Sequence, residues 1–150
     1  MEYKYTTHSE KETIELAENF EAEKFPNMVI CLEGDLGSGK TTFAKAFAKA
    51  LGINEEVTSP TFTIVKEYFE GDLPLFHMDV YRIEDRVEEL GIEEYFNKNG
   101  VTIIEWSDMI RDYLPEERMV IKFKILNENT RVLQIEAHGS MYEDLCEDVL

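Results

Sequence analysis

Basic residues are scarce in this chain of 150 amino acids. Its 15 lysines and arginines face 32 aspartates and glutamates, which leaves a formal net charge of −17 at pH 7. This balance opposes binding of a nucleic acid through a broad basic surface that would contact its phosphates. Any nucleic acid substrate would have to be held by another molecule, and solubility explains the acidity at least as well as a partner does.

Long apolar runs and cysteines are also scarce. No stretch approaches the ~20 apolar residues of a membrane span, and no basic segment followed by an apolar one opens the chain. The two cysteines, Cys31 and Cys146, offer neither metal-ligand spacing nor a disulfide framework. We therefore expect a cytoplasmic protein without membrane contact, folded as a single domain over residues 1–150, with Cys31 packed in its core.

Glycine is used sparingly but gathers in one motif. Residues 34–42 read GDLGSGKTT and match the phosphate-loop pattern G-x-x-x-x-G-K-[ST]. An apolar run at 28–32 precedes this loop and an alanine-rich segment at 43–51 follows it, in the required order of strand, loop and helix. Glycines let the backbone point successive N–H groups at a phosphate, so the motif predicts nucleotide binding; the alternative is a glycine-rich turn with an exposed lysine.

The residue types in the loop predict individual roles. Lys40 can reach the β- and γ-phosphates, Thr41 can place its hydroxyl on a bridging Mg²⁺, and Thr42 lies near the α-phosphate. We therefore expect ATP and Mg²⁺ as ligands. The loop residues expected to contact the nucleotide are Asp35, Leu36, Gly37, Ser38, Gly39, Lys40, Thr41 and Thr42.

Two acidic residues end apolar strands. The run at 75–79 ends in Asp79, as a Walker B strand does, and the run at 101–104 leads into Glu105 and Trp106. Asp79 is a candidate for binding Mg²⁺ or orienting the attacking water. Glu105 competes with it for the Mg²⁺ role, and the simpler alternative for Glu105 is a solvated acid at a strand end. His77 points to the same side of its strand as Asp79 and has no role assigned from the sequence.

The segment after the loop helix is rich in threonine. Thr61 could contact the γ-phosphate and Mg²⁺ in a switch that orders with ATP, or the threonines could simply favour a strand, and spacing supports both equally. The hydrophobic pattern predicts helices over 10–25, 107–114 and 141–150, one or two short helices within 83–96, an edge strand at 3–6, and hairpins of 61–69 with 75–81 and of 119–125 with 131–137.

Four blocks together resemble the bacterial ATPase family TsaE, also called YjeE. They are GDLGSGKTTF from residue 34, SPTFT from 59, HMDVYR from 77 and IEWS from 104, and the similarity runs roughly from Ser9 to Ala137. The resemblance implies an ATPase required for N6-threonylcarbamoyladenosine (t6A) at adenosine 37 of tRNAs that read codons starting with A. It implies that ATP hydrolysis supports or resets the TsaB–TsaD transfer complex, so that tRNA is engaged only indirectly.

The resemblance also implies site roles. Thr41 and Glu105 resemble magnesium ligands, Asp79 a Walker B-like acid, and Thr61 part of a switch region. Lys40 and Thr42 resemble phosphate contacts, Trp106 an aromatic beside the nucleotide, and Ser9 and Arg131 peripheral contacts; Met78 stands where the family commonly has Phe, a volume-conserving change. The expected fold is a P-loop NTPase-like α/β three-layer sandwich with a mixed, largely parallel central sheet plus antiparallel hairpins.

Two rival functions share the loop. A small-molecule kinase usually needs several arginines on a closing lid, whereas this chain has five dispersed arginines. A nucleotide-gated docking module with little turnover would use ATP to order the Thr61 segment and expose a binding face. The favoured mechanism assigns catalytic roles to Lys40, Asp79 and Glu105, with weak ATPase activity when the chain is alone.

Overall fold

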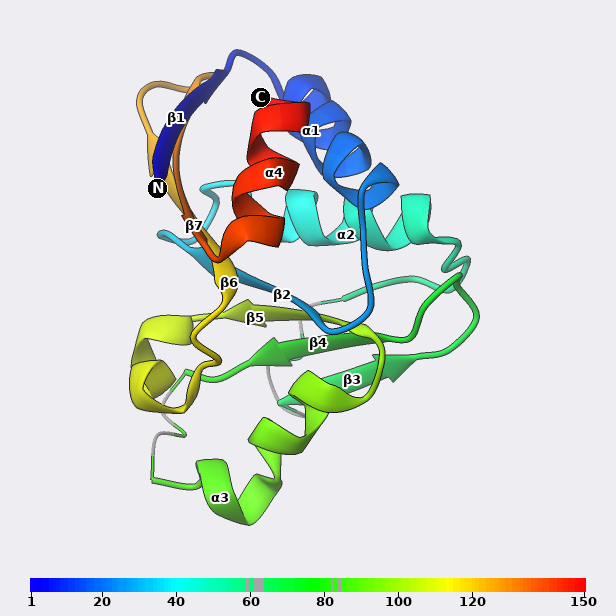
Figure 1. Ribbon diagram of the computed structural model, residues 1–150. Helices are drawn as coiled ribbons and strands as arrows, with labels where there is room; N and C mark the ends of the chain where they lie inside the picture. The colour runs from blue at the N-terminus through cyan, green and yellow to red at the C-terminus, as the bar shows by residue number, and fades with distance from the viewer. Residues whose placement is uncertain (59, 61–63, 82, 84) are drawn as a thin grey trace.

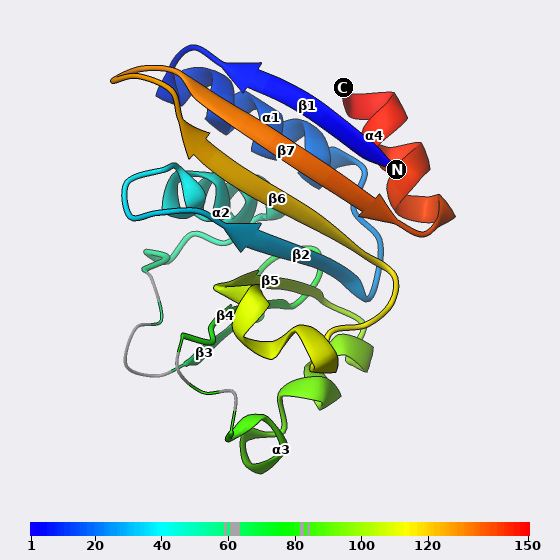
Figure 2. The same cartoon turned by 90° about the vertical axis from the view of Figure 1, so that its left-hand side faces the viewer.

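A computed structural model describes residues 1–58, 60, 64–81, 83 and 85–150. Its centre is a seven-stranded sheet in the order β1-β7-β6-β2-β5-β4-β3, visible edge to edge in Figure 2. Within the described residues, no helix is long and apolar enough to cross a membrane. The strands are β1 (Glu2–Thr7), β2 (Met28–Glu33), β3 (Val65–Tyr68), β4 (Leu75–Asp79), β5 (Val101–Glu105), β6 (Arg118–Ile125) and β7 (Arg131–His138). The helices are α1 (Glu10–Ala22), α2 (Lys40–Leu51), α3 (Val87–Leu90) and α4 (Ser140–Val149), with 3-10 segments η1 (Ile92–Asn97) and η2 (Ser107–Tyr113).

The sheet is covered on both faces, which gives the expected three layers. Figure 1 shows α1, α2 and α4 on one side of the sheet and α3 with the 3-10 segments on the other. Alternation along β2 explains this arrangement: Met28, Ile30 and Leu32 pack under the three long helices, whereas Val29 and Cys31 pack on the opposite side. A strand that is apolar at every position is thus buried on both faces, as a central parallel strand must be.

Strand directions divide the sheet into two parts. β2 pairs in parallel with β5 and β6, and β4 pairs in parallel with β5. β7 runs antiparallel to both β1 and β6, and β3 runs antiparallel to β4. The mixed α/β sheet is confirmed, with four mutually parallel strands in its interior. Parallel neighbours bring their carboxyl ends to one edge, so the segments that follow β2, β4 and β5 meet there.

The first helix starts as the sequence predicts but ends earlier. The Ser9 hydroxyl accepts a hydrogen bond from the Glu12 N–H at 3.2 Å, and the Glu12 carboxylate accepts one from the His8 N–H at 3.0 Å. This is a capping pattern that satisfies helix-end donors. The helix stops at Ala22 rather than near Phe25, because the Glu23 N–H bonds to Phe20 and Glu21 carbonyls in a tightened last turn.

Several other boundaries differ from the predictions. The β3–β4 hairpin spans Val65–Tyr68 and Leu75–Asp79, shorter at both ends than predicted, and positions 61–63 lie outside the described residues. The predicted helix at 107–114 is two 3-10 turns, because Ile110 has non-helical dihedral angles. The 83–96 region forms α3 and η1, which Gly91 separates with a positive φ, as its sequence indicates. The edge strand, the terminal hairpin and the last helix are confirmed within one or two residues.

The C-terminal helix is tied to the central strand. The Tyr142 hydroxyl accepts a hydrogen bond from the Val29 N–H at 2.8 Å in the buried interior. Both cysteines are buried and free, and burial raises the pKa of the Cys31 thiol to about 12. Because this thiol stays protonated at neutral pH, the predicted packing role of Cys31 is confirmed.

Candidate functional site

The glycine-rich loop at 34–42 connects β2 to α2. Gly34 and Gly39 have φ values of 146° and 116°, a region that side chains other than glycine rarely adopt. A Cβ atom on Gly34 would also lie 2.7 Å from the Phe123 carbonyl oxygen, so the loop passes too close to β6 for any other residue. α2 begins at Lys40, and the first N–H groups of a helix have no acceptor within it, so they face outward as donors.

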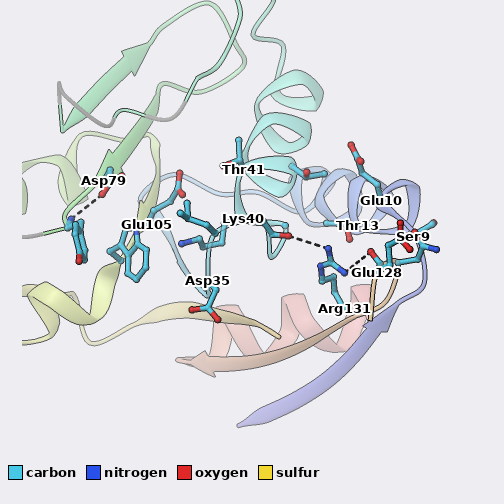
Figure 3. Close-up of a pocket in the computed structure, with 17 residues that line it drawn as sticks. Ser9, Glu10, Thr13, Asp35, Lys40, Thr41, Asp79, Glu105, Glu128 and Arg131 are labelled. Carbon is cyan, nitrogen blue, oxygen red and sulfur yellow. Dashed lines mark hydrogen bonds between the residues drawn. The ribbon is translucent and has the colours of Figure 1, made fainter. Parts of the chain in front are cut away.

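A cavity of about 840 Å³ opens beside this loop, a size typical of small-molecule sites. Figure 3 shows the two sides of this cavity. The strand-end side carries Lys40, Thr41, Asp79, Tyr81, Glu105 and Trp106. The hairpin side carries Ser9, Glu10 and Thr13 from the start of α1 with Glu128, Asn129 and Arg131 from the β6–β7 hairpin. Asp35, Leu36, Gly37, Gly39 and Thr42 complete the lining.

Lys40 is unusual among lysines because its side chain is buried, with 5% of the residue exposed. Burial lowers the pKa of its ammonium group, while the nearby carboxylates of Glu105 and Asp79 act in the opposite direction. Among the described residues, no carboxylate lies within 4.0 Å of its nitrogen. The Lys40 Nζ instead lies 4.0 Å from the centre of the Trp106 ring, a cation–π contact. Lys40 is thus a desolvated cation that forms no ion pair with the described acids.

Asp79 and Glu105 end neighbouring strands and stand opposite each other in the β4–β5 register. Their surroundings nevertheless differ. Glu105 is 4% exposed, and its Oε2 lies 2.7 Å from the Nε2 of His77. Asp79 is partly exposed and accepts a hydrogen bond from the Tyr81 N–H at 3.1 Å. Burial raises the pKa of Asp79, and the negative charge of Glu105 raises it further. The sheet therefore places a buried carboxylate and a partly exposed one side by side at the ends of two strands.

The hairpin side is held by one arginine. The Arg131 Nη1 donates to the carbonyls of Asn127, Glu128 and Thr130 at 2.8 to 3.2 Å. Its Nη2 donates to the Gly37 carbonyl at 3.2 Å, across 94 positions of sequence. Arg131 thus joins the turn between β6 and β7 to the tip of the glycine-rich loop, as Figure 3 shows. Among the described arginines, it is the one that lines the cavity.

The structure gathers most of the residues predicted from the sequence. Ser9, Asp35, Leu36, Gly37, Gly39, Lys40, Thr41, Thr42, Asp79, Glu105, Trp106 and Arg131 all line the cavity. Ser38 does not line it; its side chain is buried, and its hydroxyl has no hydrogen-bond partner in the part of the chain that the structure describes. Thr61 lies outside the described residues.

Sequence reasoning missed Glu10, Thr13, Tyr81, Glu128 and Asn129, which also line the cavity. No motif marked Glu128 and Asn129 of the hairpin turn, because their proximity to the loop arises from the pairing of β6 with β2. The contact between His77 and Glu105 was also missed. One sequence pattern could have indicated this contact. Both residues belong to apolar strands that end in an acid, and two such strands could be neighbours in the sheet.

The fold and the loop define the class: an α/β protein of the P-loop NTPase-like type, with a glycine-rich loop between its central strand and the helix that follows. The family model described as "Threonylcarbamoyl adenosine biosynthesis protein TsaE" matches residues 7–133. The tRNA threonylcarbamoyladenosine biosynthesis protein TsaE of Bacillus subtilis (strain 168) is 49% identical over 146 residues, covering 97% of this chain and 92% of that protein.

Its counterpart from Rickettsia typhi is 36% identical over 144 residues and is covered over 99% of its length. A crystal structure of Bacillus subtilis YdiB superposes with a TM-score of 0.88 at 44% identity, covering 99% of this chain and 94% of that one. The chain belongs to the TsaE family, and the membership predicted from its four sequence blocks is confirmed.

Proposed function

We propose that this chain is a Mg²⁺-dependent ATPase and that it acts in t6A formation on tRNA. The names of its relatives give threonylcarbamoyladenosine biosynthesis on tRNA as the role of those proteins. One observation carries the proposal: a buried lysine at the start of α2 shares a cavity with two carboxylates that end adjacent parallel strands. This is the arrangement that phosphoryl transfer uses to hold phosphates, bind a cation and orient a nucleophile.

The loop fits a polyphosphate. Its glycines hold positive φ values, the first N–H groups of α2 have no acceptor within the helix, and the Ser38 hydroxyl is buried without a hydrogen-bond partner among the described residues. Lys40 adds a cation that is already desolvated, so its attraction to a phosphate oxygen is not weakened by bound water. These features support binding of the β- and γ-phosphates of ATP at the strand-end side.

The acids fit a divalent cation. Glu105, Asp79 and the Thr41 hydroxyl offer oxygen atoms, which Mg²⁺ prefers, and five carboxylates against two basic residues line the cavity. A triphosphate would meet net repulsion there without a counter-ion. When bound, Mg²⁺ would neutralise charge on the phosphate oxygens. We assign Thr41 and Glu105 as its ligands.

The remaining chemistry falls to side chains of this chain. Lys40 stabilises charge that develops on the transferred phosphate, and the loop N–H groups hold that phosphate in place. Asp79 accepts a hydrogen bond from a water molecule and orients it for in-line attack, for which its partly exposed carboxylate is suited. Trp106 and Tyr81, whose ring centres lie 5.0 Å apart, form an aromatic wall on this side.

We further propose that the chain works in the cytoplasm with TsaB and TsaD, and that it engages tRNA through them. The net charge of −17 supports this division, because such a chain repels a polyanion. ATP hydrolysis would then drive or reset the transfer complex rather than modify the RNA directly.

The test is Mg²⁺-dependent phosphate release from ATP, measured for the chain alone and with the TsaB–TsaD complex. The Lys40→Ala variant should lose the activity. Lys45→Ala should keep it, because Lys45 is an exposed lysine on the same helix outside the cavity. Tight ATP binding without hydrolysis in both conditions would contradict the ATPase proposal and would indicate a nucleotide-gated docking module instead. Transfer of the phosphate to a small molecule would indicate a kinase, which the single described cavity arginine disfavours.

A further inference from the structure

We propose that His77 is a positioning residue for Glu105 and thereby sets how tightly the site holds a divalent cation. This inference rests on the proposed function, because it concerns the cation that accompanies the nucleotide. It assigns a role to a buried residue that the mechanism above does not use.

His77 lies in the interior of β4, two residues before Asp79, and is 1% exposed. β4 pairs in parallel with β5, and His77 stands opposite Ile103, so its ring can reach forward to Glu105 at the strand end. The Nε2 atom lies 2.7 Å from the Glu105 Oε2. Both partners are buried, and a short hydrogen bond between buried groups fixes both side chains.

The contact defines the tautomer of the ring. With the Glu105 carboxylate as the acceptor, the proton is assigned to the His77 Nε2. In the neutral ring the Nδ1 atom is then an acceptor, and it is buried without a hydrogen-bond partner among the described residues. If His77 served only to fill space, an apolar side chain would pack there equally well and would bury no unsatisfied nitrogen atom. The polarity of His77 therefore serves Glu105.

Positioning matters because Glu105 has a competing partner. Figure 3 shows it between Asp79 and Lys40, and its negative charge acts on the ammonium group of Lys40. A carboxylate free to rotate could pair directly with Lys40, which would remove the cation ligand and the phosphate ligand at once. With Oε2 bound to His77, the carboxylate is held in one orientation, and Oε1 is left to face a cation.

The main experiment titrates Mg²⁺ into each variant in the presence of the fluorescent nucleotide mant-ATP. In His77→Phe, the Mg²⁺ concentration that gives half of the maximal increase in mant-ATP affinity should rise by about 10- to 100-fold. This is the usual effect of losing a residue that orients a metal ligand. Its nucleotide affinity in EDTA should stay unchanged. His77→Gln keeps an N–H donor at a similar reach and should restore most of the Mg²⁺ response.

The matched control is His138→Phe. His138 also contacts a glutamate, Glu136, at 3.1 Å, but this pair lies on β7 and does not line the cavity. It should leave the Mg²⁺ titration unchanged. A double variant separates positioning from general damage: in a Glu105→Gln background, His77→Phe should add no further weakening of the Mg²⁺ response, because the ligand that it orients is already altered.

NMR of the nucleotide-free chain tests the geometry without any activity. Long-range ¹H–¹⁵N spectra of the three histidines should show His77 as the Nε2–H tautomer. An Nδ1–H tautomer would overturn the inference, as would a normal Mg²⁺ titration for His77→Phe or an equal loss of affinity in EDTA. A wild-type chain that binds mant-ATP with no response to Mg²⁺ would overturn the proposed cation site itself, which distinguishes the two failures.

Discussion

The two sides of the cavity are built in different ways. The strand-end side rests on adjacent parallel strands and on two buried charged side chains, Glu105 fixed by His77 and Lys40 placed over Trp106. The hairpin side rests on an exposed turn, and Arg131 holds it through backbone carbonyls. The strand-end side holds charged groups in positions that exclude solvent, whereas the hairpin side forms the exposed rim of the cavity.

This difference teaches where function should be sensitive to substitution. Charges in a desolvated setting act strongly on a bound phosphate, whereas contacts at an exposed rim are weakened by water and salt. We therefore expect large effects on turnover from the strand-end side and modest effects on affinity from the hairpin side.

Lys40→Ala should have the largest effect. It removes the desolvated cation of the strand-end side and at least two charge-assisted contacts, so nucleotide affinity should fall by about 100-fold or more and hydrolysis should disappear. Isothermal titration with ATP and a phosphate-release assay measure both. A Lys40→Ala variant that keeps wild-type affinity would show that the loop backbone alone holds the nucleotide.

Glu105→Ala should separate binding from turnover. Without this ligand, Mg²⁺-dependent hydrolysis should fall on the order of 100-fold, whereas nucleotide affinity in EDTA should largely remain. The measurement is a pair of Kd values, with and without Mg²⁺, beside the rate. An equal loss of binding in Lys40→Ala and Glu105→Ala would contradict the division of roles between them.

Arg131→Ala tests the hairpin side. Loss of its backbone contacts, each worth about 1 kcal/mol, should weaken nucleotide affinity by roughly five- to tenfold and leave the rate at saturating ATP nearly unchanged. Arg131→Lys should not restore affinity, because an ammonium cannot bridge carbonyls as the planar guanidinium does. Arg118→Ala is the control, since Arg118 also binds backbone carbonyls at a strand start but lies outside the cavity. A collapse of the rate at saturation would place Arg131 with the strand-end side.

The smallest expected effect is on folding stability, and Asp79→Asn tests it in the nucleotide-free chain, apart from the turnover that this strand-end residue supports. The pKa of Asp79 is raised in the folded chain, so its ionised form opposes folding once the pH exceeds the ordinary carboxyl value of about 3.9. Removing the charge should raise the nucleotide-free Tm at pH 7 by about 1–2 °C, or roughly 0.5 kcal/mol. The gain should vanish as the pH falls through the ordinary carboxyl range.

Asp108→Asn should change the stability at pH 7 in the opposite direction and lower the Tm. A hydrogen bond from Arg111 lowers the pKa of Asp108, so its charge supports folding at neutral pH and that support is lost on acidification. Thermal unfolding monitored by circular dichroism between pH 3 and pH 7 compares the two variants. A destabilised Asp79→Asn at pH 7 would show that the ionised Asp79 carboxylate supports folding, against the direction that its raised pKa predicts.

The sequence predicted the strand-end side better than the hairpin side. The loop motif and the acids at two strand ends are local patterns, and parallel pairing brings them together without further information. Glu128 and Asn129 reach the cavity only because β6 pairs with β2, a partnership between segments about 90 residues apart that no local pattern encodes. The role of His77 was hidden for the same reason, since its partner lies on another strand.

Element boundaries show a related limit. The α1 start carried a capping signal and was placed correctly, whereas its end carried none and was placed three residues too late. The helix expected at 107–114 had suitable periodicity, yet Ile110 is 1% exposed and its backbone leaves the helical region as it packs. Tertiary packing determines the backbone conformation of that segment, and local helix propensity could not predict it.

The contact between Lys40 and Trp106 has a consequence for spectroscopy. Trp106 is the single tryptophan of the chain, and an ammonium group lies 4.0 Å from the centre of its ring. Indole emission responds to a nearby charge, and a phosphate that attracts Lys40 would change the distance between the two. The chain therefore carries an intrinsic fluorophore at its candidate site, so that occupancy can be followed on unlabelled protein.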